Sequence, residues 1–276
     1  MNQEGKNSEI PKSTLLTAWT AMLMASALSL IIWREFLMSE PYWWPWIHSI
    51  GLLIILGVSS MRDTLKPLRP FLVILILIFL LGFGGGWRWG LIPFIRSSEA
   101  WLTWESQVPW AISAIMTHLL RLVPAIAVLS YLLIIGRKPN DFYLVKGDIH
   151  ALIQPTKVLG IKEPEPWPKT AIIFITIYCG ATLVFLILTT KFTIDAFMLT
   201  LPFLPTVLLI ATMNAFNEEF TLRAAPLSEL REGVGDTMGL LITTVYFGLG
   251  HYYGIPNGIL GVILSSFLGW FLGKNM

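Results

Sequence analysis

The sequence predicts an all-α fold: a polytopic transmembrane helix bundle of about eight spans, with both termini on the cytoplasmic side. Its composition supports this class. Of the 276 residues, 55% are hydrophobic and only 13% are charged, and the mean hydropathy is +0.68. A typical soluble domain carries about 25% charged residues, so this chain cannot cover a globular surface with charge. A bilayer is the solvent that suits it.

The same numbers exclude several classes of protein. A chain so poor in charge is neither a soluble enzyme nor a disordered tail. The net charge of +2 is too small to indicate binding to a polyanion such as nucleic acid. The single cysteine, Cys179, rules out a disulfide within the chain and a cysteine-rich zinc site.

Eight apolar runs are the candidate spans, because a spanning helix needs about 20 mostly apolar residues. The first, fourth, fifth and sixth are strong, whereas the second, seventh and eighth are short. In chain order, the runs are Leu15–Ile32, Trp46–Ser60, Phe71–Phe83, Trp110–Ile135, Thr170–Thr189, Leu199–Phe216, Met238–Gly250 and Gly258–Phe271.

The basic residues indicate the orientation of these spans. With a cytoplasmic N-terminus, 14 of the 19 Lys and Arg residues fall in inner segments and four in outer loops. Arg121 is the remaining one and lies within a span. This bias follows the positive-inside rule. We therefore expect a multi-pass integral membrane protein, in the cytoplasmic (plasma) membrane of a prokaryote.

Polarity along the chain predicts three regions. Residues 1–135 form an N-terminal membrane region of four spans. Residues 136–169, which include the proline-rich run Glu163 to Pro168, form a cytoplasmic connector. Residues 170–276 form a C-terminal core of four spans.

Several smaller patterns belong to packing. Ser97 to Gln107 predicts a short surface helix that a serine caps and Pro109 ends. Gly261, Ser265, Gly269 and Gly273 form a stripe of small residues that lets another helix approach closely. His118 and Arg121 share one helical face, where they either line a polar cavity or, more often for such a pair, make hydrogen bonds of helix packing.

The strongest chemical signal follows the sixth run. Glu218 and Glu219 are adjacent, and Arg223 comes four residues after the second. If the helix continues, Glu219 and Arg223 share a face and can pair. Glu218 then points about 100° away and is free to act as a general base on water. The alternative is a helix end with an ion pair at the membrane surface, and this motif alone does not decide between the two.

A second signal ends the seventh run, where Phe247 and His251 lie one turn apart. A histidine here could share a water molecule with a carboxylate, although a lone one more often serves packing. Taken together, the two motifs favour a site made of Glu218, Glu219, Arg223 and His251.

At these residues the chain resembles the CAAX-protease and bacteriocin-processing family of intramembrane glutamic endopeptidases, also called the Abi family. The family's first motif is E-E-x-x-x-R, which Glu218, Glu219 and Arg223 match. Its second motif is F-x-x-x-H, which Phe247 and His251 match. The resemblance covers roughly residues 199–276, and the N-terminal half offers only a general likeness.

The sequence departs from the family pattern in one respect. The family normally adds a helix with H-x-x-x-N or H-x-x-x-D, thought to help hold the scissile carbonyl. No such pattern follows His251 in this sequence. Either the sequence stops before that helix, or the protein lacks this part of the site. We therefore expect residues 170–276 to lack the last motif helix, and with it an oxyanion site whose loss costs ~10²–10³-fold or more in rate.

The resemblance implies hydrolysis of a peptide bond without a covalent intermediate. Glu218 and His251 would activate water in a cavity open to the cytoplasm, and Glu219 and Arg223 would hold the motif helix. No cofactor is expected, although one histidine and two carboxylates leave zinc as a minor option. The expected partners are the lipid bilayer and a peptide or lipid-anchored protein substrate, with no nucleic acid.

Two other classes of function stay open. One is a catalytically inactive membrane protein of the same family, such as an immunity factor or a scaffold. The other, more remote, is a small transporter that uses His118, Arg121 and the glutamate pair as a polar path. The chain lacks paired halves with interrupted helices, which speaks against the transporter.

Overall fold

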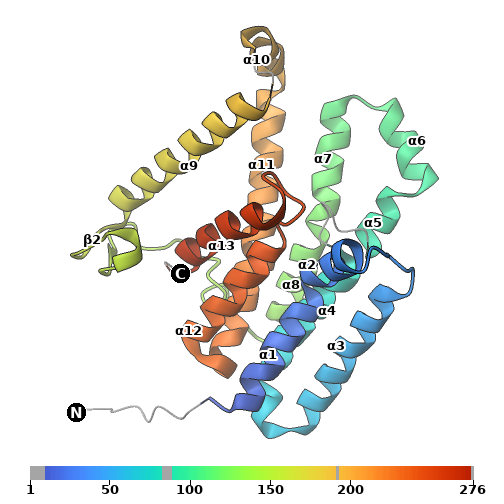
Figure 1. Ribbon diagram of the computed structural model, residues 1–276, viewed down its shortest axis with the longest axis vertical. Coiled ribbons are helices and arrows are strands. Elements are labelled where there is room, and N and C mark those ends of the chain that lie inside the picture. The colour runs from blue at the N-terminus through green and yellow to red at the C-terminus, as the bar shows by residue number, and fades with distance from the viewer. Residues whose placement is uncertain (1–9, 83–88, 191–192, 275–276) are drawn as a thin grey trace. The chain divides into compact units, whose positions relative to one another are not determined.

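The computed structural model describes residues 10–82, 89–190 and 193–274. Helices make up most of these residues, and their strands form one short two-stranded sheet, so the all-α prediction is confirmed (Figure 1). Contacts divide the chain into two compact units. The first combines residues up to Leu144 with Leu209–Lys274, and the second is Val145–Leu208.

The N-terminal part of the first unit is a series of helices joined by short turns. Its elements are α1 (Lys12–Ala25), α2 (Ala27–Ile31), the π-helical turn η1 (Ile32–Phe36), α3 (Trp44–Met61), the 3₁₀ segment η2 (Asp63–Leu68), α4 (Arg69–Leu81), α5 (Leu91–Arg96), α6 (Glu99–Gln107), α7 (Trp110–Arg121) and α8 (Val123–Ile134). The hydroxyl of Ser98 accepts a hydrogen bond from the Trp101 amide and caps α6. This confirms the short helix expected before Pro109.

The C-terminal part of the first unit is built on one long helical rod. Helix α11 (Leu204–Glu219), the π-helical turn η5 (Phe220–Ala224) and α12 (Ala225–Leu249) follow one another without a break. The helix thus continues past Phe216, where the sixth apolar run ends, and Glu219 pairs with Arg223 along it, as the sequence predicts for a continuing helix.

Gly235 then reverses the chain within the segment labelled α12. Its φ of 73° lies in the left-handed region, which glycine adopts without strain. The arm after this residue runs back along the arm before it, so that a Cβ on Gly239 would touch Leu227 and Leu230. The result is a helical hairpin, which the final helix α13 (Gly258–Lys274) follows.

One hydrophobic core joins the N-terminal helices to this hairpin. Helices α1 and α4 contact α12, and α8 contacts η5. Fully buried side chains come from both parts, among them Met22, Leu72 and Leu132 from the first and Phe220 and Ile242 from the second. The N-terminal half is thus the support on which the hairpin rests.

A charged contact reinforces this junction. Arg137, just after α8, donates two hydrogen bonds to the buried carboxylate of Glu229 on α12, at 3.0 and 2.8 Å. Its remaining terminal nitrogen lies 3.0 Å from Glu232. Such a two-pronged arrangement fixes orientation as well as charge.

The small-residue stripe on α13 packs as the sequence predicts. A Cβ on Gly269 would lie 3.0 Å from the ring of Phe247, and one on Gly273 would lie 2.8 Å from Leu240. Gly261 lies against the carbonyl of Pro256 in the loop before α13. Three of the four stripe residues therefore permit close approach.

Gly248, on the opposite side of the same contact, offers a stability test. An added Cβ would lie 2.8 Å from the Val262 carbonyl and would collide with the Ser266 hydroxyl. We expect Gly248→Ala to lower the free energy of unfolding by about 1–3 kcal/mol, because α12 and α13 must separate. Gly57→Ala on α3 is the matched control, since nothing lies within 4 Å there. Thermal unfolding in detergent should show a lower Tm for the first variant alone, and equal Tm values would contradict the packing account.

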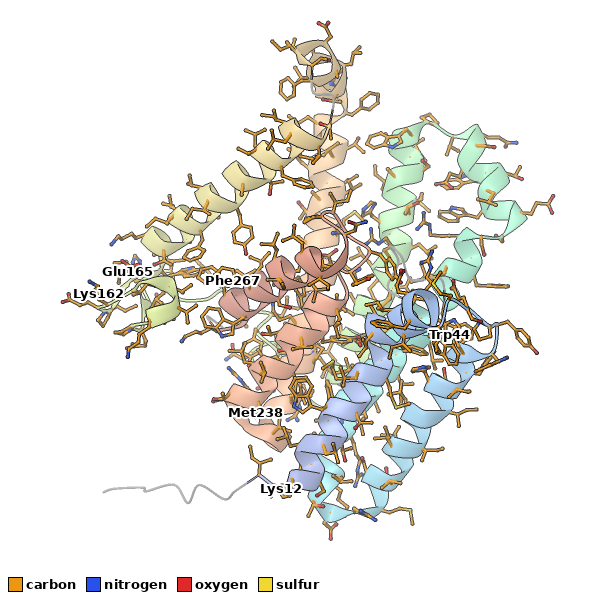
Figure 2. All side chains as sticks on the ribbon, in the orientation of Figure 1. Lys12, Trp44, Lys162, Glu165, Met238 and Phe267 are labelled. Atoms are coloured by element: carbon orange, nitrogen blue, oxygen red, sulfur yellow. The ribbon has the colours of Figure 1, made fainter. Side chains whose placement is uncertain are left out.

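The second unit consists of a small hairpin and apolar helices. Strands β1 (Leu152–Ile153) and β2 (Glu165–Pro166) pair antiparallel, and η3 (Lys157–Leu159) lies between them. Glu165, labelled with Lys162 in Figure 2, accepts hydrogen bonds from Lys169 and Thr170. Helix α9 (Trp167–Thr189) is apolar around its circumference, as a lipid-exposed helix is. Helix α10 (Ile194–Thr200) and η4 (Leu201–Phe203) follow.

Five helices in the described residues are long and apolar enough to cross a membrane, or six if the bent pair α1 and α2 with η1 is one span. Helix α13 is apolar but shorter. One of the five segments, Ile194–Leu249, takes in both the sixth and the seventh apolar run. Each apolar run lies mostly on helix, with breaks at single residues such as Ser26 and Leu122, and Phe83 lies outside the described residues. The count of eight and the orientation stay predictions.

Candidate active site

The two adjacent carboxylates lie within the helical rod and not at its end. Glu218 and Glu219 are the last residues of α11, and the π-helical turn η5 begins directly after them. A π-helical turn inserts an extra residue into the helix and occurs often at functional sites. Here it lies between the carboxylates and the rest of the rod, so the polar motif is part of a continuous helix.

Glu218 makes polar contacts on both of its oxygens. The Asn214 side-chain amide, one turn earlier on α11, donates a 2.8 Å hydrogen bond to Oε1. The second oxygen, Oε2, lies 3.5 Å from Nε2 of His251. The Glu218 side chain is 24% exposed and that of His251 26%, so both are partly accessible.

His251 reaches Glu218 because the hairpin closes at Gly235. The two residues lie at nearly equal distances along the chain on either side of that reversal, so the antiparallel arms bring them together. The sequence placed the two motifs at the ends of consecutive spans and predicted one site from them, and the reversal at Gly235 is what brings them together.

The imidazole of His251 is oriented by its own helix. Nδ1 lies 2.8 Å from the Phe247 carbonyl, which accepts its hydrogen and leaves Nε2 to face Glu218. The Phe247 ring packs on the imidazole, with centroids 4.7 Å apart. Burial opposes protonation of the imidazole, but Glu218 and the Phe247 carbonyl outweigh it and raise the pKa of His251 above its ordinary value.

Glu219 and Arg223 form the ion pair that the sequence predicts. The Arg223 side chain is 3% exposed, whereas that of Glu219 is 34% exposed. Two other guanidinium nitrogens of Arg223, Nε and Nη1, are buried with no hydrogen-bond partner in the part of the chain that is described. The pair therefore leaves hydrogen-bond donors buried beside the motif helix.

Sequence reasoning assigned no role to two asparagines of α11. Asn214 orients Glu218, and the buried Asn217 accepts a hydrogen bond from Thr221 at 3.2 Å. Asn214 could have been found, because a lone amide four residues before Glu218 lies on the same face of a helix.

His118 and Arg121, the polar pair predicted on one helical face of the N-terminal half, are only partly explained by helix packing. His118 makes a 2.8 Å hydrogen bond to the Ala114 carbonyl of its own helix. The Glu218 carboxylate interacts favourably with the charge of Arg121, whereas the positive charge of Arg96 interacts unfavourably with it. Arg121 thus belongs to the surroundings of the carboxylate.

The site offers few donors for a metal ion. Among the described residues, no group of three or more His, Cys, Asp and Glu side chains could hold a metal ion. Glu218 and His251 offer two donors, whereas protein zinc sites use three or four protein ligands.

Comparison with known proteins identifies one family. A family model described as type II CAAX prenyl endopeptidase Rce1-like matches residues 200–275. These residues include both motifs, so the predicted resemblance is confirmed for this region. No curated protein and no solved structure matches the chain.

Proposed function

We propose that this chain, whose C-terminal region resembles type II CAAX prenyl endopeptidases, is an intramembrane endopeptidase. It hydrolyses a peptide bond with a water molecule activated by Glu218 and His251. The observation that carries the proposal is the 3.5 Å approach of Glu218 Oε2 to His251 Nε2 across the hairpin.

The chemistry follows from the two groups that face each other. Glu218 takes a proton from water, and the hydroxide adds to the scissile carbonyl. The proton then passes to the leaving amine as the C–N bond breaks, so water is divided between the two products. His251 holds the water through Nε2, because Nδ1 is engaged by the Phe247 carbonyl. General acid–base catalysis of this kind contributes typically ~10²–10⁴-fold.

The remaining polar residues position these two. Asn214 fixes the rotation of the Glu218 carboxylate through its 2.8 Å hydrogen bond. Glu219 and Arg223 tie the π-helical turn together by their ion pair, so that Glu218 keeps its direction.

The proposal extends to the substrate and to the membrane in which the protein works. The protein is a multi-pass membrane protein, and we assign it to the plasma membrane of a prokaryote. Its partners are the bilayer and a peptide or lipid-anchored protein whose cleaved bond lies near the membrane. No cofactor takes part, and nucleic acid is not a partner.

The test is peptide cleavage by the full chain in proteoliposomes, followed by mass spectrometry of the products. We expect His251→Ala to slow cleavage about 10²-fold, at the lower end of the range for general acid–base groups. His150→Ala, at an exposed histidine of the second unit, is the matched control and should retain full activity. Equal rates for both variants would exclude His251 from the reaction.

Chelation separates this mechanism from a metal-dependent one. Cleavage should survive a strong chelator unchanged, because Glu218 and His251 act without a metal. Loss of activity on chelation, with recovery on adding zinc, would replace the proposal by a metallopeptidase mechanism. If no peptide is cleaved under any condition, the inactive scaffold becomes the better description.

A further inference from the structure

We propose that Tyr253 positions His251 for the proposed reaction by holding the loop of this histidine against the N-terminal turn η1. The proposal rests on the proposed peptidase function and deepens it, because it gives the N-terminal half a part in the site. Tyr253 acts through His251, two residues earlier in the chain, and not on the peptide itself.

The backbone of His251 lies just beyond the regular part of its helix. Helix α12 ends two residues before it, and the His251 amide donates to the Gly248 carbonyl in a turn, at 2.9 Å. Helix ends fray more readily than helix interiors. The 2.8 Å contact of Nδ1 with the Phe247 carbonyl fixes the ring against the helix end. The place of the imidazole therefore depends on what holds the loop that follows.

His251 is the first residue of a hydrogen-bonded turn, and Tyr253 is the third. The Gly254 amide donates to the His251 carbonyl at 2.9 Å and closes this turn. The Gly258 amide donates to the Tyr252 carbonyl at 2.6 Å, which ties the turn to the start of α13. A contact that fixes Tyr253 thus also fixes the backbone of His251.

The Tyr253 side chain is held at two points by η1. Its hydroxyl donates a 3.1 Å hydrogen bond to Oε1 of Glu35, 218 positions away in the chain. The guanidinium of Arg34 lies over the ring, 5.1 Å from its centre, in a cation–π contact. Arg34 in turn pairs with Glu40 at 3.7 Å. Burial and the Glu35 carboxylate raise the pKa of Tyr253 to about 12, so the hydroxyl keeps its proton at neutral pH and donates it.

The turn η1 is itself fixed to two helices. The indole Nε1 of Trp33 donates a 3.3 Å hydrogen bond to Nε2 of His48 on α3. Since an indole nitrogen only donates, Nε2 accepts, and the hydrogen on Nδ1 points to the Met24 carbonyl of α1 at 3.1 Å. Trp33 and Tyr253 both pack against the hydrophobic core. Glu35 therefore extends from an anchored turn, which suits it to hold a loop in place.

The test is the rate of peptide cleavage by Tyr253→Phe, which removes the hydroxyl and keeps the ring beneath Arg34. We expect kcat to fall about tenfold with KM unchanged, because a displacement of about 1 Å can cost up to ~10²-fold in rate. Glu35→Leu should have the same effect, whereas Glu35→Gln, which keeps an acceptor, should retain most of the activity. Tyr42→Phe is the matched control, at a tyrosine that is 88% exposed, and should cleave at the wild-type rate.

The His251→Ala background separates positioning of the histidine from a general effect on the fold. If Tyr253 acts through His251, adding Tyr253→Phe to His251→Ala should slow cleavage no further, since the two residues act as a unit. The same loss of rate from Tyr253→Phe in both backgrounds would mean that the tyrosine acts on the fold, and would overturn the proposal. Wild-type rates for Tyr253→Phe and Glu35→Leu would overturn it as well.

A second measurement does not depend on cleavage. NMR of the histidine-labelled full chain in nanodiscs reports the pKa of His251, which burial lowers but Glu218 and the Phe247 carbonyl raise above its ordinary value. We expect Tyr253→Phe to lower this pKa, because the imidazole moves away from the Glu218 carboxylate, and Tyr42→Phe to leave it unchanged. If this pKa falls as expected but the wild type cleaves no peptide, the peptidase function alone fails. If the wild type cleaves and Tyr253→Phe changes neither rate nor pKa, the positioning role alone fails.

Discussion

Glu218→Gln is expected to reduce peptide-bond hydrolysis by about 10⁴-fold, the upper end of what one acid–base group contributes. Glutamine keeps the size of the side chain but cannot accept the proton from water. The measurement is product formation in proteoliposomes under single-turnover conditions, so that substrate binding does not limit the rate. Glu218→Asp should retain a measurable part of the activity, because the base is present but displaced.

Three comparisons sharpen this test. Glu163→Gln, at an exposed carboxylate of the second unit, should cleave at the wild-type rate. The double variant Glu218→Gln, His251→Ala should be no slower than Glu218→Gln alone, since residues that act as a unit lose their effect together. If Glu218→Gln still cleaves the peptide, or still produces the effect of the wild-type protein in cells, the glutamic-peptidase mechanism is refuted and an immunity or scaffold role is favoured.

Arg137→Met is expected to cost about 3–5 kcal/mol in the free energy of unfolding, the largest stability effect that a single substitution should have here. The Glu229 side chain is 2% exposed, so removing Arg137 leaves a buried carboxylate without its counter-charge. Glu229 and Glu232 together raise the pKa of Arg137 above its already high ordinary value, so the guanidinium is charged at every accessible pH. Unfolding in mixed detergent micelles measures the loss.

The double variant Arg137→Met, Glu229→Leu identifies the cause. If the cost comes from the unpaired charge, replacing both partners by apolar residues should recover most of the stability. Arg62→Met, which changes an exposed arginine, should have little effect. A double variant as unstable as Arg137→Met alone would show that packing of the arginine stem, and not the ion pair, is what stabilises the junction.

Local patterns in the sequence predicted local features of the structure well. The pairing of Glu219 with Arg223, the serine cap before α6 and the glycine stripe on α13 each depend on residues a few positions apart. Helical periodicity alone relates such residues, so no knowledge of the tertiary fold is needed.

The features that sequence reasoning missed depend on distant residues. Arg137 and Glu229 are 92 positions apart, and no local pattern in either segment predicts their contact. The sequence predicted that Glu218 and His251 belong to one site, but not the reversal at Gly235 that brings them together. A turn at this position could have been predicted from Gly233 and Asp236, which flank Gly235.

The support of the hairpin by the N-terminal helices has a consequence for biogenesis. The ribosome makes α1, α4 and α8 before the hairpin of α11 and α12, so these helices reach the bilayer first. The hairpin carries several charged side chains, and each is expensive to transfer from the translocon into hydrocarbon alone. The helices already inserted provide an apolar surface in place of lipid, and Arg137, just after α8, provides a partner for the charge of Glu229. The order of translation thus delivers this costly segment after the helices against which it packs.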